Sequence, residues 1–195
     1  MMTYGASMIG SEMPVHILGI AFRPEGGTAA FGPTTYDLRV DVSTGVNPTN
    51  ALSYTFDANH GADRSTVFDG ALSVGAATLG TSPSSFVLVI PFDEPFAWNP
   101  KCGPLVVDVR NRGLVSGSGV VCDGPSGTVG EYGRIVATAG ANSATANFPG
   151  AGSTQHFAFV AKLMLDCDAA PSSLALTEGN AVTGYPWGGF ANLRI

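Results

Sequence analysis

The feature that most constrains this chain is an alternation of apolar and polar residues at a period of two. In the segment TYDLRVDV, Tyr36, Leu38, Val40 and Val42 fall on one face, and the aspartates and arginine between them fall on the other. Alternation of this kind is typical of a β-strand with one buried side and one side in water. The segment therefore predicts a half-buried strand of a β-sheet.

Segments of the same character recur at intervals of roughly ten residues, separated by turns rich in glycine and proline. They span residues 15–22, 52–56, 65–70, 71–74, 85–92, 104–111, 133–139, 156–165 and 190–195. No window supports a helix of about ten or more residues with a capping signal at both ends. The sequence therefore predicts an all-β fold, an antiparallel β-sandwich of jelly-roll-like topology.

The length of 195 residues is ordinary for a single β-sandwich domain. Residues 166–184 are rich in small side chains, include Pro171, and separate the last strong strand pattern from the terminal segment FANLRI. We therefore expect a sandwich domain over residues 1–171 and an extended arm over residues 172–195. The arm is expected to complete a sheet, either in its own chain or in a neighbouring subunit.

The balance of charge excludes some classes of function. Charged residues make up 12% of the chain, about half of the usual share of roughly 25%. The net charge of -6 argues against a nucleic-acid partner, because such proteins need basic patches. No apolar run reaches the roughly 18 residues of a membrane-spanning helix. The neutral surface is expected to be covered by other subunits or by glycans, and a monomer with a Ser/Thr-rich surface is the alternative.

The three cysteines form no zinc-binding or redox motif. Cys102 and Cys122 flank a segment that reads as two strands joined by a turn around Asn111-Arg112-Gly113. Such a hairpin would bring its two ends side by side, so a disulfide between Cys102 and Cys122 is one expectation and two free thiols are the other. Cys167 is then left as a buried thiol or as half of an intermolecular bridge.

The sequence holds no catalytic pattern, and we expect the protein not to be an enzyme. His16 and His156 lie within strand patterns, where each is expected to point outward or to be hydrogen-bonded in the core. Asp93 and Glu94 are adjacent in a strand pattern and would face opposite ways, so they cannot act together as acid and base. No G-x-S-x-G motif is present. We predict no catalytic and no cofactor-binding residue.

Residues 57–63, DANHGAD, superficially resemble a calcium-binding loop. Asp57, Asn59 and Asp63 alternate with small residues around Gly61. The complete spacing of a calcium loop and its distant bidentate glutamate are missing. We therefore predict a turn stabilised by Asp and Asn side chains, without metal ligands.

Three aromatic residues lie in Gly/Pro-rich turns and suggest a binding alternative. They are Trp98, Tyr185 and Trp187. Exposed rings on a β-sandwich can stack on sugar faces, whereas rings that pack against the end of the sandwich or a neighbouring subunit have a structural role. Both interpretations stay open from the sequence.

Read with its C-terminal end placed before its N-terminal end, the chain has a T-E-G-N motif, an aromatic-Pro-aromatic-Gly turn, an arginine strand and a strand that ends in I-x-F-R. The matching positions are Thr177, Glu178, Gly179 and Asn180, then Tyr185, Pro186, Trp187 and Gly188, then Arg194, Tyr4, Ala6 and Ser7, and finally Ile20, Ala21, Phe22 and Arg23. YDLRVDVST, LSYTFDANHGADRSTVFDGALSV, FVLVIPFDEPFAWNP and GPLVVDVR follow. In these features the chain resembles a family of bacterial secreted proteins known mainly as PEP-CTERM-sorted surface proteins.

The resemblance covers most of the chain and keeps the order of the family except at the termini, where the family's first segment stands last. Met1 and Met2 stand where the family tends to have glutamines. The resemblance implies a β fold and a location outside the cell or at the cell surface. It implies no catalytic residues.

The chain starts and stops within what reads as one strand, FANLRI followed by MMTY. We expect a head-to-tail filament in which the arm of one subunit fills a strand-shaped gap in the next, as in donor-strand complementation. A truncated or permuted monomer with adjacent termini is the alternative. The residues expected at the interface are Tyr185, Pro186, Trp187, Phe190, Leu193 and Ile195.

The function predicted from the sequence is that of a structural subunit of an extracellular bacterial filament or surface fibre, with copies of itself as partners. The second prediction is a secreted carbohydrate-binding or adhesive module that uses Tyr185, Trp187 and Trp98.

Overall fold

The computed structural model describes residues 1–24, 30–78, 85–117, 119, 122–123, 131–137, 140–147, 158–166, 184–185 and 188–192. Of residues 30–31, 77–78, 147, 184–185 and 188–192 it describes the backbone alone. The expected boundary between residues 171 and 172 lies outside these ranges, as do His156 and Cys167.

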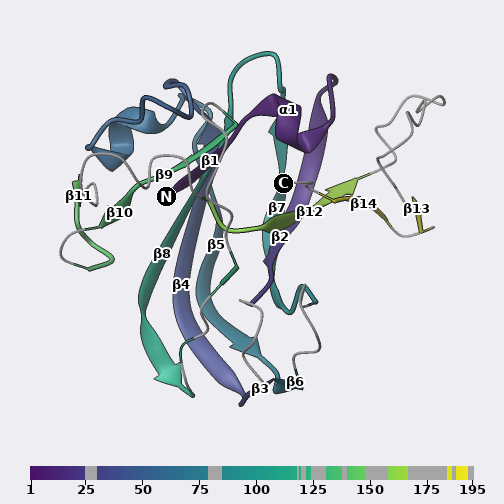
Figure 1. The fold of residues 1–195 in the computed structure, drawn as a ribbon, viewed down its shortest axis with the longest axis vertical. Coiled ribbons are helices and arrows are strands. Elements are labelled where there is room, and N and C mark those ends of the chain that lie inside the picture. The colour runs from purple at the N-terminus through teal and green to yellow at the C-terminus, as the bar shows by residue number, and fades with distance from the viewer. Residues whose placement is uncertain are drawn as a thin grey trace.

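Among the described residues, two five-stranded antiparallel sheets pack against each other (Figure 1). The first sheet has the order β5-β4-β8-β1-β9. Its strands are β5 (Ser65–Val74), β4 (Thr34–Thr44), β8 (Leu105–Ser116), β1 (Met2–Tyr4) and β9 (Tyr132–Arg134). The predicted antiparallel β-sandwich is confirmed.

The second sheet has the order β13-β14-β12-β2-β7. Its strands are β13 (Gly184–Tyr185), β14 (Gly188–Asn192), β12 (Ala161–Asp166), β2 (Val15–Phe22) and β7 (Leu88–Trp98). Smaller elements complete the described chain: the strand pairs β3 (Ala30–Phe31) with β6 (Ala77–Thr78) and β10 (Val136–Ala137) with β11 (Ala146–Asn147), the short helix α1 (Ala6–Ile9) and the 3-10 turn η1 (Phe56–Asn59).

The main core lies between the two sheets and follows the alternation in the sequence. Strand β4 buries Tyr36, Leu38, Val40 and Val42, the four residues predicted to share its apolar face. Side chains of the second sheet complete the same core cluster, among them Ile17, Ile20, Ile90 and Leu163. Burial of this apolar surface is the main source of stability for such a sandwich, at about 25 cal/mol per Å².

A second, smaller core covers the outer face of the first sheet. It consists of Met1, Leu52, Phe56, Val106, Ile135 and Ala146. These side chains come from Met1 just before β1, from β8, from the chain between β4 and β5, and from residues 135–146. Because this layer lies over one end of the sheet, polar side chains on that outer face are enclosed as well.

The strand expected over residues 52–56 is not formed. Instead, the buried side chain of Asn59 forms hydrogen bonds with several backbone groups of the loop. Its amide nitrogen donates hydrogen bonds to the carbonyl groups of Ser53, Thr55 and Phe56, at 3.0 to 3.4 Å. These bonds turn the chain into η1, since local side-chain bonds of Asn compete with a sheet ladder.

Strand β8 is one continuous strand, where the sequence suggested a hairpin. At Asn111-Arg112-Gly113 its register against β4 shifts, so that Leu38 pairs with Asn111 and Asp37 with Gly113. Arg112 is the extra residue, as in a β-bulge. The backbone N–H of Gly113 donates a hydrogen bond to the side-chain oxygen of Asn111 (3.0 Å). This bond satisfies the Gly113 N–H at the bulge, and the chain does not reverse.

The expected Cys102–Cys122 disulfide is therefore wrong for this structure. Both residues are free thiols, with Cys102 exposed and Cys122 half-buried. Cys102 precedes β8, whereas Cys122 follows it and forms an isolated bridge with Pro24 beyond the end of β2. A strand that runs straight from residue 105 to residue 116 has no turn to bring the two thiols together.

Candidate functional site

The described parts of the predicted arm, residues 184–185 and 188–192, form the outer strands of the second sheet. Strand β14 pairs antiparallel with β12 of the same chain, with Leu163 opposite Ala191 and Met164 opposite Phe190. Strand β13 adds to the other side of β14. In Figure 1 these two strands extend from the body of the sandwich beside β12. Strand β14 thus covers the backbone edge of β12 that faces away from β2.

Two of the six predicted interface residues fall within this edge. Tyr185 lies in β13 and Phe190 lies in β14. The other four, Pro186, Trp187, Leu193 and Ile195, lie outside the described residues.

A second group of polar residues lies beneath the loop between β4 and β5, and the sequence analysis did not find it. The hydroxyl of Ser43 lies 2.7 Å from Nδ1 of His60. On the other side of the ring, Nε2 of His60 lies 3.8 Å from a carboxylate oxygen of Asp108. The signal in the sequence was weak: Ser43 and Asp108 occupy polar positions of two strands, and nothing in the sequence places His60 between them.

In space, His60 lies between Ser43 and Asp108, as the histidine does in a catalytic serine–histidine–aspartate triad. The surroundings of these residues are not those of an active site. Ser43 is 0% exposed, so a substrate carbonyl has no path to its hydroxyl in this structure. No described group forms a hydrogen bond with Nε2 of His60. The three residues connect β4, the loop and β8, and their arrangement stabilises the loop on the sheet.

Asp108, the acid of this group, has a pKa well below its ordinary value. Burial would raise the pKa of Asp108, but the side chain of His60 and the charges of the N-terminal ammonium and Arg110 outweigh it and lower the pKa to about 2. Arg110 Nε lies 3.2 Å from the carboxylate, and the Met1 nitrogen lies 3.7 Å from it. Asp108 is therefore ionised at neutral pH and surrounded by cationic or donor groups.

Asp41 is a second buried carboxylate on the outer face of the first sheet. Its oxygens accept hydrogen bonds from Arg39 (3.0 Å), Thr66 (2.7 Å) and Arg64 (2.6 Å), and Arg110 lies 3.6 Å away. Burial acts to raise the pKa of Asp41, but these donors lower it overall. A carboxylate with this many partners is a structural anchor, because little of its accepting capacity remains for a ligand.

The DANHGAD loop is explained by its own hydrogen bonds. Asp57 accepts from Arg64 (2.6 Å), both carboxylate oxygens of Asp63 accept from the backbone N–H of Thr44 (3.0 and 3.1 Å), and Asn59 organises η1. Within the part of the chain that the structure describes, no group of His, Cys, Asp or Glu has the arrangement of a metal site.

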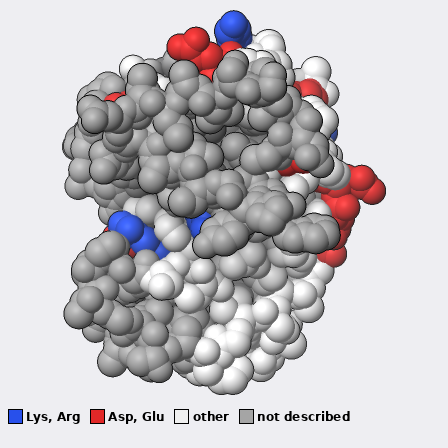
Figure 2. All heavy atoms as spheres, turned by 90° about the vertical axis from the view of Figure 1, so that its right-hand side faces the viewer, with Lys and Arg blue, Asp and Glu red and all other residues white. Residues whose placement is uncertain are grey.

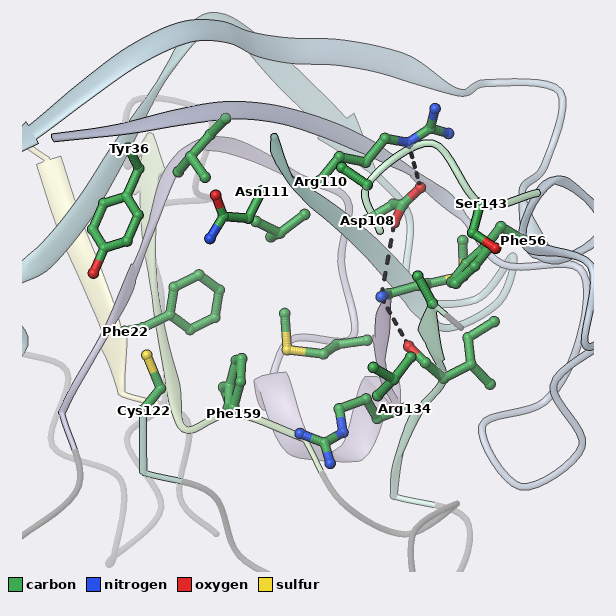
Figure 3. Close-up of a pocket in the computed structure, with 18 of the residues that line it drawn as sticks. Phe22, Tyr36, Phe56, Asp108, Arg110, Asn111, Cys122, Arg134, Ser143 and Phe159 are labelled. Atoms are coloured by element: carbon green, nitrogen blue, oxygen red, sulfur yellow. Dashed lines mark hydrogen bonds and ion pairs between the residues drawn. The ribbon is translucent and has the colours of Figure 1, made fainter. Parts of the chain in front are cut away.

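A cavity of about 440 Å³ opens between the two sheets (Figure 3). Its inner wall contains core residues such as Phe22, Leu88 and Ile90, which are buried. Its outer rim contains the exposed residues Val136 and Gly140. The sequence analysis gave no indication of this cavity, because its lining comes from strands far apart in the chain.

Trp98 does not lie at the surface, where one of the binding hypotheses needs it. The side chain is 1% exposed and belongs to the main core, at the end of β7. The side chains of Tyr185 and Trp187 lie outside the described residues. A sugar-stacking site that includes Trp98 is therefore excluded in this structure.

Comparison of the chain with protein-family models, with curated proteins and with solved structures finds no match. The described residues contain no helix that is both long and apolar enough to cross a membrane.

Proposed function

We propose that this protein is a structural subunit of an extracellular bacterial filament or surface fibre, assembled by exchange of strand β14 between copies. The observation that carries the proposal is the position of β14 in the second sheet. This five-residue strand near the end of the chain covers the edge of β12 through backbone pairing. In the structure the pairing is made within one chain, and the same pairing between copies would link them head to tail.

The length of chain before β13 supports such an exchange. Residues 167–183 connect β12 to β13 and lie outside the described residues. At about 3.4 Å per extended residue, a segment of this length can reach on the order of 55 Å. That reach exceeds the width of a domain of this size, so β14 of one copy can meet β12 of another. Exchange of an identical element through a long connection is a common route to assembly.

The composition of the surface is consistent with contacts between subunits. Only 12% of the residues are charged. In the view of Figure 2, the charged side chains lie near the margins and in one recess, and the lower part of this face is uncharged where it is coloured. Interspersed charge normally keeps a soluble monomer from associating.

A cysteine pair placed across β12 and β14 tests the proposal. Met164 and Phe190 are directly opposed in the ladder, and opposed residues bring their Cβ atoms within roughly 5 Å. In a background of Cys102→Ser, Cys122→Ser and Cys167→Ser, the double variant Met164→Cys/Phe190→Cys is oxidised and run on a denaturing gel. Exchange between copies gives a ladder of covalent oligomers.

The control pair is Met164→Cys/Ala97→Cys, because Ala97 is exposed on β7, on the other side of β2. It should give no ladder. A Met164→Cys/Phe190→Cys product that contains internal disulfides and runs only as a monomer would contradict strand exchange. Electron microscopy of the same samples shows whether the oligomers are fibres.

The alternative, a secreted carbohydrate-binding or adhesive module, now depends on Tyr185 and Trp187 without Trp98. Titration with polysaccharides, followed by tryptophan fluorescence, distinguishes the two proposals.

A further inference from the structure

Met164 is one of two methionines of this chain that solvent reaches. The chain has five methionines. Met1, Met2 and Met8 are at most 8% exposed, Met164 is half-buried and Met13 is 46% exposed. A peroxide oxidises the thioether of methionine to a sulfoxide, and exposed side chains react most readily. Met13 and Met164 are therefore the methionines that are open to this modification.

Met164 lies on the outer face of the second sheet, one strand from its edge. The neighbouring Leu163 belongs to the main core, and successive side chains of a strand point to opposite faces. In the ladder, Met164 is opposite Gly19 of β2 on one side and opposite Phe190 of β14 on the other. A chemical change at Met164 therefore takes place between the body of the sheet and its outer strands.

The methyl group of Met164 occupies the space that a side chain at position 19 would need. A Cβ atom added to Gly19 would overlap Cε of Met164. The same Cβ atom would lie 2.8 Å from the carbonyl oxygen of Ile90 and 3.2 Å from Cα of Pro91. The thioether thus packs against the backbone of β2 and close to that of β7, and backbone cannot rotate aside to make room for an added atom.

This contact stands next to an irregularity in the ladder. Between Met164 and Leu165 the register of β12 against β2 shifts, as at a β-bulge, which disrupts pairing locally. The fit of Met164 over Gly19 therefore helps to hold β12 in place at this point. Among the described residues, β14 pairs only with β12 and β13, so the attachment of β14 to the sandwich depends on β12.

We propose that Met164 is a modification site, and that oxidation of its thioether by a peroxide loosens β14 from the sandwich. With hydrogen peroxide, the sulfur forms a bond to one oxygen, the O–O bond breaks, and the other oxygen leaves as water with both hydrogens. The sulfur is oxidised and the peroxide is reduced. The inference does not rest on exchange of β14 between copies, because it concerns the attachment of β14 within one chain.

The sulfoxide weakens the contact between β12 and β2 in either position open to it. It is polar and one oxygen larger than the thioether. Over Gly19, it brings a second hydrogen-bond acceptor to the carbonyl oxygen of Ile90, and an acceptor buried without a donor is unfavourable. Turned toward water, it takes the methyl group away from Gly19 and leaves that space unfilled.

Hydrogen peroxide is the probe, used on the whole protein in the cysteine-free background. Peptide mass spectrometry measures the rate of sulfoxide formation at each methionine. We expect Met13 and Met164 to be oxidised at least about tenfold faster than the three buried methionines. Hydrogen–deuterium exchange of the peptide that contains residues 188–192 should become at least about fivefold faster after oxidation, because local opening sets this rate.

Two matched variants separate the effects of the two accessible methionines. Met164→Leu keeps an apolar side chain of similar volume that peroxide does not oxidise, so peroxide should leave hydrogen exchange of residues 188–192 unchanged. Met13→Leu should retain the full effect, because Met13 lies in the chain between α1 and β2. Treatment of the oxidised parent protein with methionine sulfoxide reductases should restore slow exchange, which keeps the test valid if Met164→Leu fails to fold.

Oxidation of Met164 at the rate of the buried methionines would overturn its assignment as a modification site. Unchanged hydrogen exchange of residues 188–192 in the fully oxidised protein would overturn the link to β14, as would an effect that disappears in the Met13→Leu variant.

Discussion

Gly61 shows how one residue determines the path of the loop between β4 and β5. Its backbone N–H donates to the carbonyl oxygen of Thr44 (2.8 Å), and a Cβ at this position would lie 2.5 Å from that same oxygen. The atom in the way is backbone, which cannot rotate aside. The close approach places Asn59 and His60 over the outer face of the sheet, so the whole buried polar group depends on it.

We expect Gly61→Ala to destabilise the protein by about 1–3 kcal/mol, the usual cost of inserting a methyl group into a packed site. Gly75→Ala is the matched control, since nothing lies within 4 Å of the Cβ it would add. Urea unfolding at neutral pH measures both changes. Equal midpoints for the two variants would show that the loop accommodates the methyl group.

At the scale of the element, β8 determines the chemistry of the cysteines. A continuous strand keeps Cys102 and Cys122 apart and leaves them in different surroundings. Burial, with a smaller contribution from the charge of Asp123, raises the pKa of Cys122 to about 11. Since the thiolate is the reactive form, this thiol should react slowly.

We therefore expect iodoacetamide at pH 8 to modify Cys102 at least about tenfold faster than Cys122 in a Cys167→Ser background. Peptide mass spectrometry under non-reducing conditions measures the rates and any cross-link. A peptide pair that joins Cys102 to Cys122 would show that the chain reverses at Asn111-Arg112-Gly113 after all. Unfolding in guanidinium should abolish the difference in rate.

The main strands could be predicted from local alternation in the sequence, although residues 52–56 alternate and form no strand. The surroundings of each strand could not be predicted in this way. The core face of β4 follows directly from its pattern, and β2 occupies the residues 15–22 that were predicted. Asp41 is an example of a residue whose burial the sequence does not predict. It lies on the polar face of β4, as predicted, but it is fully buried, because Arg64 and the loop over this face belong to a distant part of the chain.

The turn around Asn111-Arg112-Gly113 was misread for the same reason. A bulge and a hairpin use the same residue types, and what distinguishes them is the contact between Arg112 and the carboxylates of Asp37 and Asp69, each at 2.6 Å. The cavity and the Ser43–His60–Asp108 group likewise come from contacts between distant segments, and their residues show no periodicity of their own.

At the scale of the whole molecule, the two buried carboxylates couple folding to acid. The pKa values of Asp41 and Asp108 are both lower in the folded state than the ordinary value of 3.8. The ionised forms therefore stabilise the fold above about pH 4, and this contribution is lost as the pH falls through the folded pKa values. For Asp108, with a pKa of about 2, the contribution is roughly 2 kcal/mol, at about 1.4 kcal/mol per pKa unit.

We expect the free energy of unfolding to fall gradually as the pH drops below about 8, because burial lowers the pKa of the Met1 ammonium group in the folded state, and to fall steeply between pH 4 and pH 2 as Asp41 and Asp108 become protonated. Asp108→Asn should lower stability at neutral pH by at least about 2 kcal/mol, because it leaves Arg110 beside a neutral amide, and its deficit relative to wild type should shrink toward pH 2 as Asp108 becomes protonated. The exposed Asp93 provides the control Asp93→Asn, whose stability should follow the wild-type curve. Urea unfolding at each pH measures the three proteins. A deficit of Asp108→Asn that stays constant down to pH 2 would mean that the ionised carboxylate is not what stabilises this face of the sandwich.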